Sequence, residues 1–349
     1  MTKSLSVRIA AAIVSAVGLF SLLDRPAQAA DAALVAAATK EGQLLWYNTL
    51  VQNQAARPLA DAFEKKYPGI KVSLVAGTQD ELLLKILAEG RANAMHADVS
   101  HGGTAAVTLI KAGLVAKFIP DTAAKFPAAY KDPDGYWTAQ VSSYLVPAIN
   151  TDLVKPADVP KTYADLLDPK WKGKMAWAQQ MSQGGPPGFI GMILTSMGQD
   201  KGMDYLTKLS KQGIINVVGN QRVVLDQVIA GQYPLALMTF SHHSEISLKK
   251  GAPVAWLKLD PAVETVDPSF VMKDAPHPNA AKLFLDFEMS VEGQTVLRNA
   301  DYIPVNPEVN AAIAGLKPEA GNFKAFTLLP AALEIGIANW IKVYNDLFK

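Results

Sequence analysis

The feature that most limits the fold of this chain is a regular alternation of short apolar strands and helices near its start. The spacing of apolar residues predicts strands over 42–49, 70–75 and 98–101, each bounded by glycine, proline or polar residues. A helical pattern follows each strand, and Leu59 and Phe63 lie on one face of the first helix. Strands and helices in this order form a mostly parallel sheet with helices on both faces.

A second α/β unit follows later in the chain. Strands are predicted at 175–178 and 235–238, and the second of these leads into a helix that begins near Ser241 and ends at Gly251. Between the two units, residues 137–151 are extended without helical spacing, and residues 254–259 are extended again. These two segments are predicted to cross between two lobes.

The predicted fold class is therefore α/β, with two lobes that each contain a mostly parallel sheet flanked by helices. We assign residues 30–140 and 257–308 to the first lobe, and residues 141–256 and 309–349 to the second. Ligands of open α/β sheets bind at the carboxyl ends of the strands. A ligand cleft between the lobes is the expected site.

The N-terminus has the pattern of a cleaved export signal. Lys3 and Arg8 precede an apolar stretch over residues 10–23, and Ala27-Gln28-Ala29 fits a small-x-small cleavage site. Residues 1–29 are predicted to be removed, so that the mature chain begins at Ala30 or Asp31. The chain has no cysteine, which suits export to an oxidising compartment.

Composition and motifs argue against several classes of function. The formal net charge of +1 gives no basis for nucleic-acid binding. The sequence offers no thiol nucleophile, no Gly-x-Ser-x-Gly elbow and no His-Glu-x-x-His zinc helix. The glycine-rich stretch 183–188 lacks the lysine of a phosphate-binding P-loop. We expect a binding protein rather than an enzyme.

Polar residues recur where predicted strands lead into helices. Free backbone N–H groups and the helix dipole make such turns suitable for anions. An ordinary helix cap explains each turn taken alone, whereas their recurrence at one topological place favours a ligand. The predicted ligand-binding residues are Asn48, Thr49, Thr78, Gln79, Gly103, Thr104, Ser142, Ser143, Ser241, His242 and His243.

The adjacent histidines His242 and His243 leave three alternatives open. They are solvated residues at a helix start, donors to an anionic ligand, or ligands of a metal ion. Protonated imidazoles would bind an anion more weakly as the pH rises through about 6.5, whereas metal binding needs neutral imidazole and reverses the sign.

The chain resembles the type II periplasmic solute-binding proteins of ATP-driven importers, in the branch of ferric-iron and phosphonate binders. The resemblance covers essentially the whole mature chain, and the order and spacing of its motifs carry it rather than any single one. The matching stretches are 46–49 (WYNT), 62–72 (AFEKKYPGIKV), 97–99 (ADV), 165–174 (DLLDPKWKGK), 249–254 (KKGAPV), 279–284 (NAAKLF), 290–294 (SVEGQ) and 302–307 (YIPVNP).

The resemblance implies a periplasmic protein whose lobes close on a ligand and then dock on the permease of an ABC importer. Iron-binding members carry two adjacent tyrosines in the positions that His242 and His243 occupy here. Ferric iron favours phenolate or carboxylate oxygen. The expected ligand is therefore a small anionic organic solute such as a carboxylate or phosphonate, or ferric iron with a synergistic anion.

The remaining expectations are a monomer, no catalytic residues and no cofactor, with ferric iron counted only as a candidate transported ligand. Two other functions stay open at this point. One is a periplasmic sensor that signals to a membrane receptor, and the other is a secreted enzyme on the same fold.

Overall fold

The structure, a computed structural model, describes residues 31–349, so the predicted signal peptide lies outside the described residues. The alternation predicted for the first lobe is confirmed. Its elements are α1 (Ala32–Glu41), β1 (Gln43–Asn48), α2 (Arg57–Lys66), β2 (Lys71–Ala76), α3 (Gln79–Arg91), β3 (Val99–His101) and α4 (Gly103–Lys111). β1 pairs in parallel with both β2 and β3.

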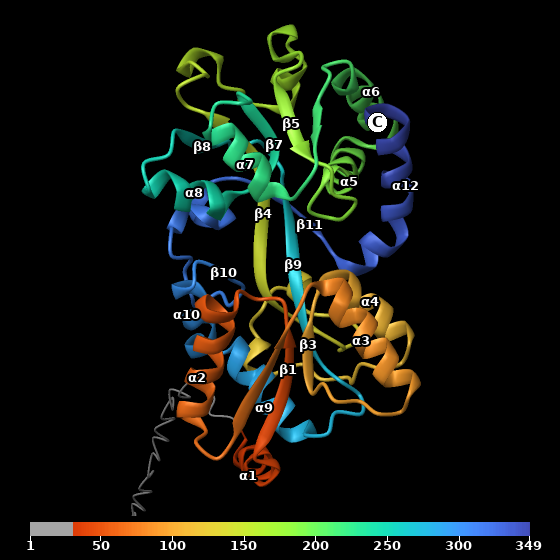
Figure 1. Cartoon of the computed structure of the whole chain (residues 1–349), viewed down its shortest axis with the longest axis vertical. Helices are drawn as coiled ribbons and strands as arrows, with labels where there is room; N and C mark the ends of the chain where they lie inside the picture. Colours follow the sequence, from red (N-terminus) through yellow and green to blue (C-terminus); the bar gives the residue numbers. More distant parts are fainter. Residues whose placement is uncertain (1–30) are drawn as a thin grey trace, which may run out of the picture.

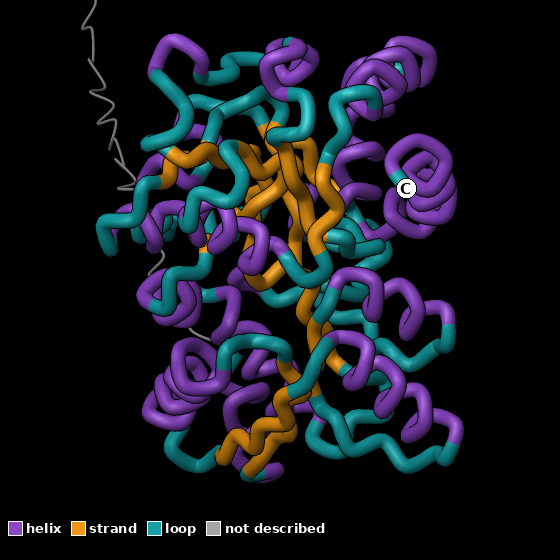
Figure 2. The backbone as a smooth tube through the Cα atoms, turned by 45° about the horizontal axis from the view of Figure 1, so that its top comes forward, coloured by secondary structure: helices purple, strands orange, loops and turns teal. Residues whose placement is uncertain are grey.

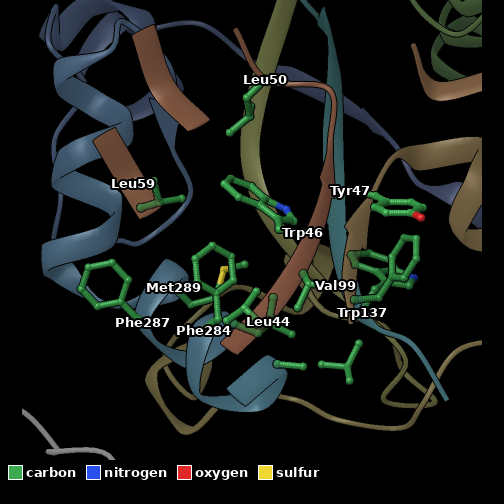
Figure 3. Packing of buried hydrophobic residues seen from close by; sticks show 14 of the residues in the cluster. Leu44, Trp46, Tyr47, Leu50, Leu59, Val99, Trp137, Phe284, Phe287 and Met289 are labelled. Atoms are coloured by element: carbon green, nitrogen blue, oxygen red, sulfur yellow. The ribbon is translucent and has the colours of Figure 1, made fainter. Parts of the chain in front are cut away.

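The core of the first lobe forms on both faces of β1, because successive side chains of a strand point to opposite faces. Trp46 is fully buried, and its ring centroid lies 4.9 Å from that of Phe284 in α9 (Pro278–Met289). Figure 3 shows Trp46, Leu59 and Phe284 on one side of the strand and Tyr47 on the other. The helix that supplies Phe284 comes from late in the chain, so the lobe is built from two distant segments.

The second lobe repeats the parallel arrangement. β5 (Met175–Ala178) pairs in parallel with β6 (Ile215–Val217) and β7 (Leu235–Phe240). Its helices are α5 (Pro186–Met197), α6 (Gln199–Ser210), α7 (Gln221–Ile229), α8 (Ser241–Lys249) and the C-terminal α12 (Pro330–Phe348). Figure 1 shows α5, α6 and α12 on one side of these strands and α7 and α8 on the other.

Two long strands join the lobes. β4 (Thr138–Asn150) and β9 (Ala262–Val271) pair antiparallel, and both run from one lobe to the other (Figure 1). They connect the parallel strands into a single sheet with the order β2-β1-β3-β9-β4-β7-β5-β6. Figure 2 shows the strands continuing through the middle of the molecule with helices around them.

The first predicted crossing, over 137–151, is confirmed as β4, but the return crossing was placed wrongly. Residues 254–256 form the short strand β8 (Val254–Trp256), which pairs with the second-lobe end of β4. The return strand is β9, which is buried on both faces. Its sequence therefore lacks the alternation that marks a half-exposed strand. Our division into lobes stays a proposal, supported by two separate hydrophobic clusters.

The remaining elements complete both lobes. They are α10 (Val291–Asn299), β10 (Ile303–Pro304), α11 (Pro318–Gly321) and β11 (Ala325–Leu328). β10 extends the sheet beside β4, and β11 pairs in parallel with β9. Within residues 31–349, none of the helices combines the length and the apolar character needed to span a bilayer.

Candidate functional site

The two lobes approach each other at the start of α4. Gly103 is buried, and a Cβ atom on it would lie 3.2 Å from Nε2 of Gln183 in the second lobe. Gly102 has a φ of +134°, and a Cβ atom there would lie 2.9 Å from Oε1 of Gln79. Both glycines leave room for neighbouring amide side chains. Thr104 is the second residue of α4.

Thr49 is held by a histidine that the sequence analysis did not select. The backbone N–H of Thr49 donates to Nε2 of His101 at 2.6 Å, and Oγ1 of Thr49 lies 2.9 Å from the same nitrogen. His101 is only 1% exposed. Burial lowers the pKa of His101 to about 3, so the ring is neutral and its Nδ1 carries the proton. Its position, the last residue of a strand, was the signal that could have identified it.

Two predicted residues serve the local structure around this site. Thr78 is exposed and forms a capping box with Glu81 at the start of α3. Asn48 is fully buried, and its Nδ2 donates to the carbonyl of Val75 at 3.5 Å. A helix cap and a link between strand ends account for these contacts, although Oδ1 of Asn48 has no partner.

The two predicted serines of β4 lie on opposite faces of the sheet. Ser142 pairs with Val266 and Ile303, whereas Ser143 pairs with Thr265. The face of Ser143 also carries Leu145, whose Cδ2 would be 3.8 Å from a Cβ atom on Gly184. Ser143 therefore shares the sheet face that lies next to the glycine-rich loop, and we leave Ser142 out of the proposed site.

Tyr302 is a further residue that the sequence analysis missed. Its hydroxyl accepts a hydrogen bond from the backbone N–H of Val51 at 3.2 Å. Tyr302 also lines a small cavity of about 10 Å³ together with His242 and Ile246 of α8. That volume suffices for about one water molecule. Tyr302 thus connects the turn after β1 with the histidine-bearing helix.

Ser241, His242 and His243 form the first turn of α8, as predicted. The centroids of the two imidazole rings are 4.4 Å apart, and both Nδ1 atoms are buried without a hydrogen-bond partner. Burial lowers the pKa of His242 to about 3 and that of His243 to about 4. Both rings are therefore neutral near pH 7. The value near 6.5 used for the expected pH dependence is that of a solvated imidazole, and burial moves the pKa of both rings below it.

Among the described residues, eight of the 18 buried side-chain polar atoms without a partner lie in this region. They lie at or just after the carboxyl ends of β1, β3, β5 and β7, which are contributed by both lobes. Buried polar groups normally have partners, so such a concentration marks a place where a ligand or water can bind. The atoms are Asn48 Oδ1, Gln52 Oε1, His101 Nδ1, Gln180 Oε1, Gln183 Oε1, Ser241 Oγ, His242 Nδ1 and His243 Nδ1.

The site is rich in hydroxyl, amide and imidazole groups and poor in carboxylates. Among residues 31–349, no group of three or more His, Cys, Asp or Glu side chains is arranged to hold a metal ion. With helix N-termini at Gly103 and Ser241 in addition, the arrangement is suited to hydrogen-bonding a small polar or anionic molecule.

Comparisons with known proteins agree with this geometry. The family described as "Bacterial extracellular solute-binding protein" matches residues 95–326. The chain is 26% identical to the "Fe(3+)-binding periplasmic protein" of Serratia marcescens, over 79% of this chain and 82% of that protein. It is 28% identical to the "Major ferric iron-binding protein" of Neisseria meningitidis serogroup B, over 80% and 85% of the two chains.

Solved structures give the same result. Iron-bound HitA from Pseudomonas aeruginosa superposes with a TM-score of 0.72 at 26% identity, over 87% of this chain and 99% of that one. AfuA from Actinobacillus pleuropneumoniae, with exogenous fructose-6-phosphate bound, has a TM-score of 0.66 at 22% identity and supports the fold alone. The family consists of the solute-binding components of ABC importers rather than of a class of enzymes. This chain belongs to the bacterial extracellular solute-binding proteins and captures a small solute between its two lobes.

Proposed function

We propose that this chain captures a small anionic organic solute, a carboxylate or a phosphonate, in the periplasm and delivers it to the permease of an ABC importer. The observation that carries this proposal is the set of unpartnered buried polar atoms between the lobes. We further propose that the chain acts as a monomer, and that binding is its whole activity.

The chemistry of the histidine turn favours an anion over a bare metal ion. Neutral imidazoles and the backbone N–H groups of the first turn of α8 can donate hydrogen bonds to a carboxylate or phosphonate oxygen. Ferric iron instead prefers anionic oxygen ligands. Within the described residues, the turn that carries His242 and His243 contains no phenolate and no carboxylate before Glu245.

Ferric iron with a synergistic anion is the second candidate. It is favoured by the names of the relatives from Serratia marcescens and Neisseria meningitidis, which are described as iron-binding. In that case the anion would supply most of the oxygen ligands, and the residues named above would bind the anion.

Native mass spectrometry of the purified protein, followed by a thermal-shift screen, tests the two candidates. The screen uses succinate, methylphosphonate, citrate and ferric citrate, each added separately. A ligand present at a hundredfold excess over its dissociation constant stabilises the native state by about 2.7 kcal/mol. Stabilisation by succinate or methylphosphonate without iron is the expected result. Stabilisation by ferric citrate, with none from citrate, succinate or methylphosphonate alone, would favour the second candidate.

Variants of the histidine turn then test the site itself. His242→Ala and His243→Ala should each weaken binding of the best ligand in the screen by about tenfold or more, because a hydrogen bond to a charged group contributes about 1.5–3 kcal/mol. His96→Ala, at an exposed position in the first lobe, is the matched control. Wild-type affinity in both histidine variants would remove the pair from the site.

A further inference from the structure

Asp267 is a partly exposed carboxyl group that the function so far does not use. It lies in the crossing strand β9, opposite Val141 of β4. Thr265, two residues earlier, is opposite Ser143. Since alternate residues of a strand share a face, Asp267 lies on the same face as Ser143 and Leu145. That is the face next to the glycine-rich loop of the second lobe.

Among the described residues, the buried acid Glu288 lies near Asp267, and no basic residue compensates its charge. Glu288 of α9 is fully buried, and its carboxyl accepts a hydrogen bond from the side chain of Gln140. Burial raises the pKa of Glu288 and of Tyr302, and the charge of Asp267 adds to both shifts. Burial alone acts on Asp267, so no basic residue among those described offsets the cost of its charge.

Hydrogen bonds connect Glu288 to the bulge of β4. Gln140 lies at a β-bulge, since the register of β4 against β9 shifts between Ala139 and Val141. Nε2 of Gln294 donates to the carbonyl of Gln140 at 2.8 Å and to that of Glu288 at 3.1 Å. These hydrogen bonds join the backbone at Gln140 in β4 to the backbone at Glu288 in α9.

Burial disfavours the charge of Asp267, and the titratable groups on its face do not offset that cost. They are Glu288, Tyr302 and His101, the last of which pairs with Ser269 on the same face. His101 is held neutral by burial, and burial raises the pKa of both Asp267 and Glu288 to about 7.

We propose that Asp267 is a specificity-determining residue that binds the anionic solute as a neutral carboxylic acid, donating its O–H to an oxygen of the solute. This rests on the proposed binding of an anion. An ionised carboxylate at this place would repel the solute, whereas a protonated one supplies a donor. Solute capture then requires one proton on Asp267, and alkaline pH releases the solute.

The first test measures succinate affinity by calorimetry between about pH 6 and pH 9, where both carboxylates of succinate are ionised. For wild-type protein, the affinity should fall about tenfold per pH unit above the pKa of Asp267. Asp267→Asn keeps a neutral donor, so it should bind within about threefold of wild type at the low end and lose the pH dependence. Asp274→Asn, at an exposed position in the same lobe, should behave as wild type.

The second test needs no ligand. The side-chain carboxyl carbon of Asp267, assigned by its absence in Asp267→Asn, is titrated by NMR in the free protein. A midpoint near 7 rather than near 4 supports the proposal.

The outcomes separate this proposal from the function on which it rests. Wild-type succinate binding with an affinity that is constant over this range, or a midpoint near 4, overturns the role of Asp267 and leaves anion binding intact. A succinate affinity that rises with pH and is abolished by Asp267→Asn means that the ionised form assists binding, which overturns the proposed neutral donor. If neither succinate nor methylphosphonate binds the wild-type protein at any pH, anion binding fails and this proposal fails with it.

Discussion

Acidification should destabilise this protein through His101, and the structure sets the sign and the size of the effect. The ring is buried, and the pKa is lowered to about 3, against about 6.5 for a solvated imidazole. Between those two values the unfolded chain binds a proton that the native state does not. Stability therefore rises with pH over that window, and the contribution is lost as the pH falls.

The magnitude follows from the width of the window. Each pKa unit corresponds to about 1.36 kcal/mol, so lowering the pH to about 5, some 1.5 units below 6.5, should lower the free energy of unfolding by about 2 kcal/mol through His101 alone. His101→Gln removes the titration, and its side-chain oxygen can still accept from the backbone N–H of Thr49, which donates to the ring in the wild type.

Urea unfolding at about pH 7 and about pH 5, for wild type and His101→Gln, measures the effect. Between the two pH values, the free energy of unfolding should fall by about 2 kcal/mol less for the variant than for the wild type. This difference does not depend on how much the substitution destabilises the protein at pH 7. His96→Gln, at an exposed position, is the matched control and should keep the wild-type difference. An equal loss in His101→Gln and wild type would refute the assignment of a buried neutral ring.

Three further variants test the framework of the site. Asp98→Ala removes the acceptor of three hydrogen bonds, two of them from His277. In urea unfolding it should lower the free energy of unfolding by about 3–5 kcal/mol, with partial recovery in Asp98→Asn, and a loss below about 1 kcal/mol would contradict this. Lys111→Glu breaks the ion pair that joins α4 to Glu334 of α12. Because the two side chains are 64% and 37% exposed, the affinity for succinate should fall by no more than about fivefold. Adding Glu334→Lys should restore the pair and the affinity. Failure of that rescue in calorimetry would show that the pair does not assist closure. Gly102→Ala, at φ +134°, should lower the melting temperature in calorimetric scans because a non-glycine residue there is strained by about 1–3 kcal/mol; an unchanged melting temperature would argue against this backbone conformation.

The helix-forming and strand-forming patterns of the sequence were sufficient for most of the elements. Leu59 and Phe63 fall on one helical face, and both are buried as that spacing requires. The prediction was less successful for β9. A strand buried on both faces lacks the period-two signal, so the return crossing was placed at β8 instead.

The candidate site was partly predictable for a related reason. Strand ends followed by polar residues are visible in the sequence, and they pointed to Thr49, Gly103 and the histidine turn. They did not reveal that Thr78 forms a capping box with Glu81, since a cap and a ligand site use the same residue types.

The sequence by itself determined the α/β class, the order of the elements and the family resemblance, because these depend on local periodicity and on motif spacing. Only the tertiary structure decided which face Ser143 and Asp267 share, which partner holds Thr49, and that His101, His242 and His243 are neutral. Those properties arise from register and desolvation, and both depend on segments that are far apart in the chain.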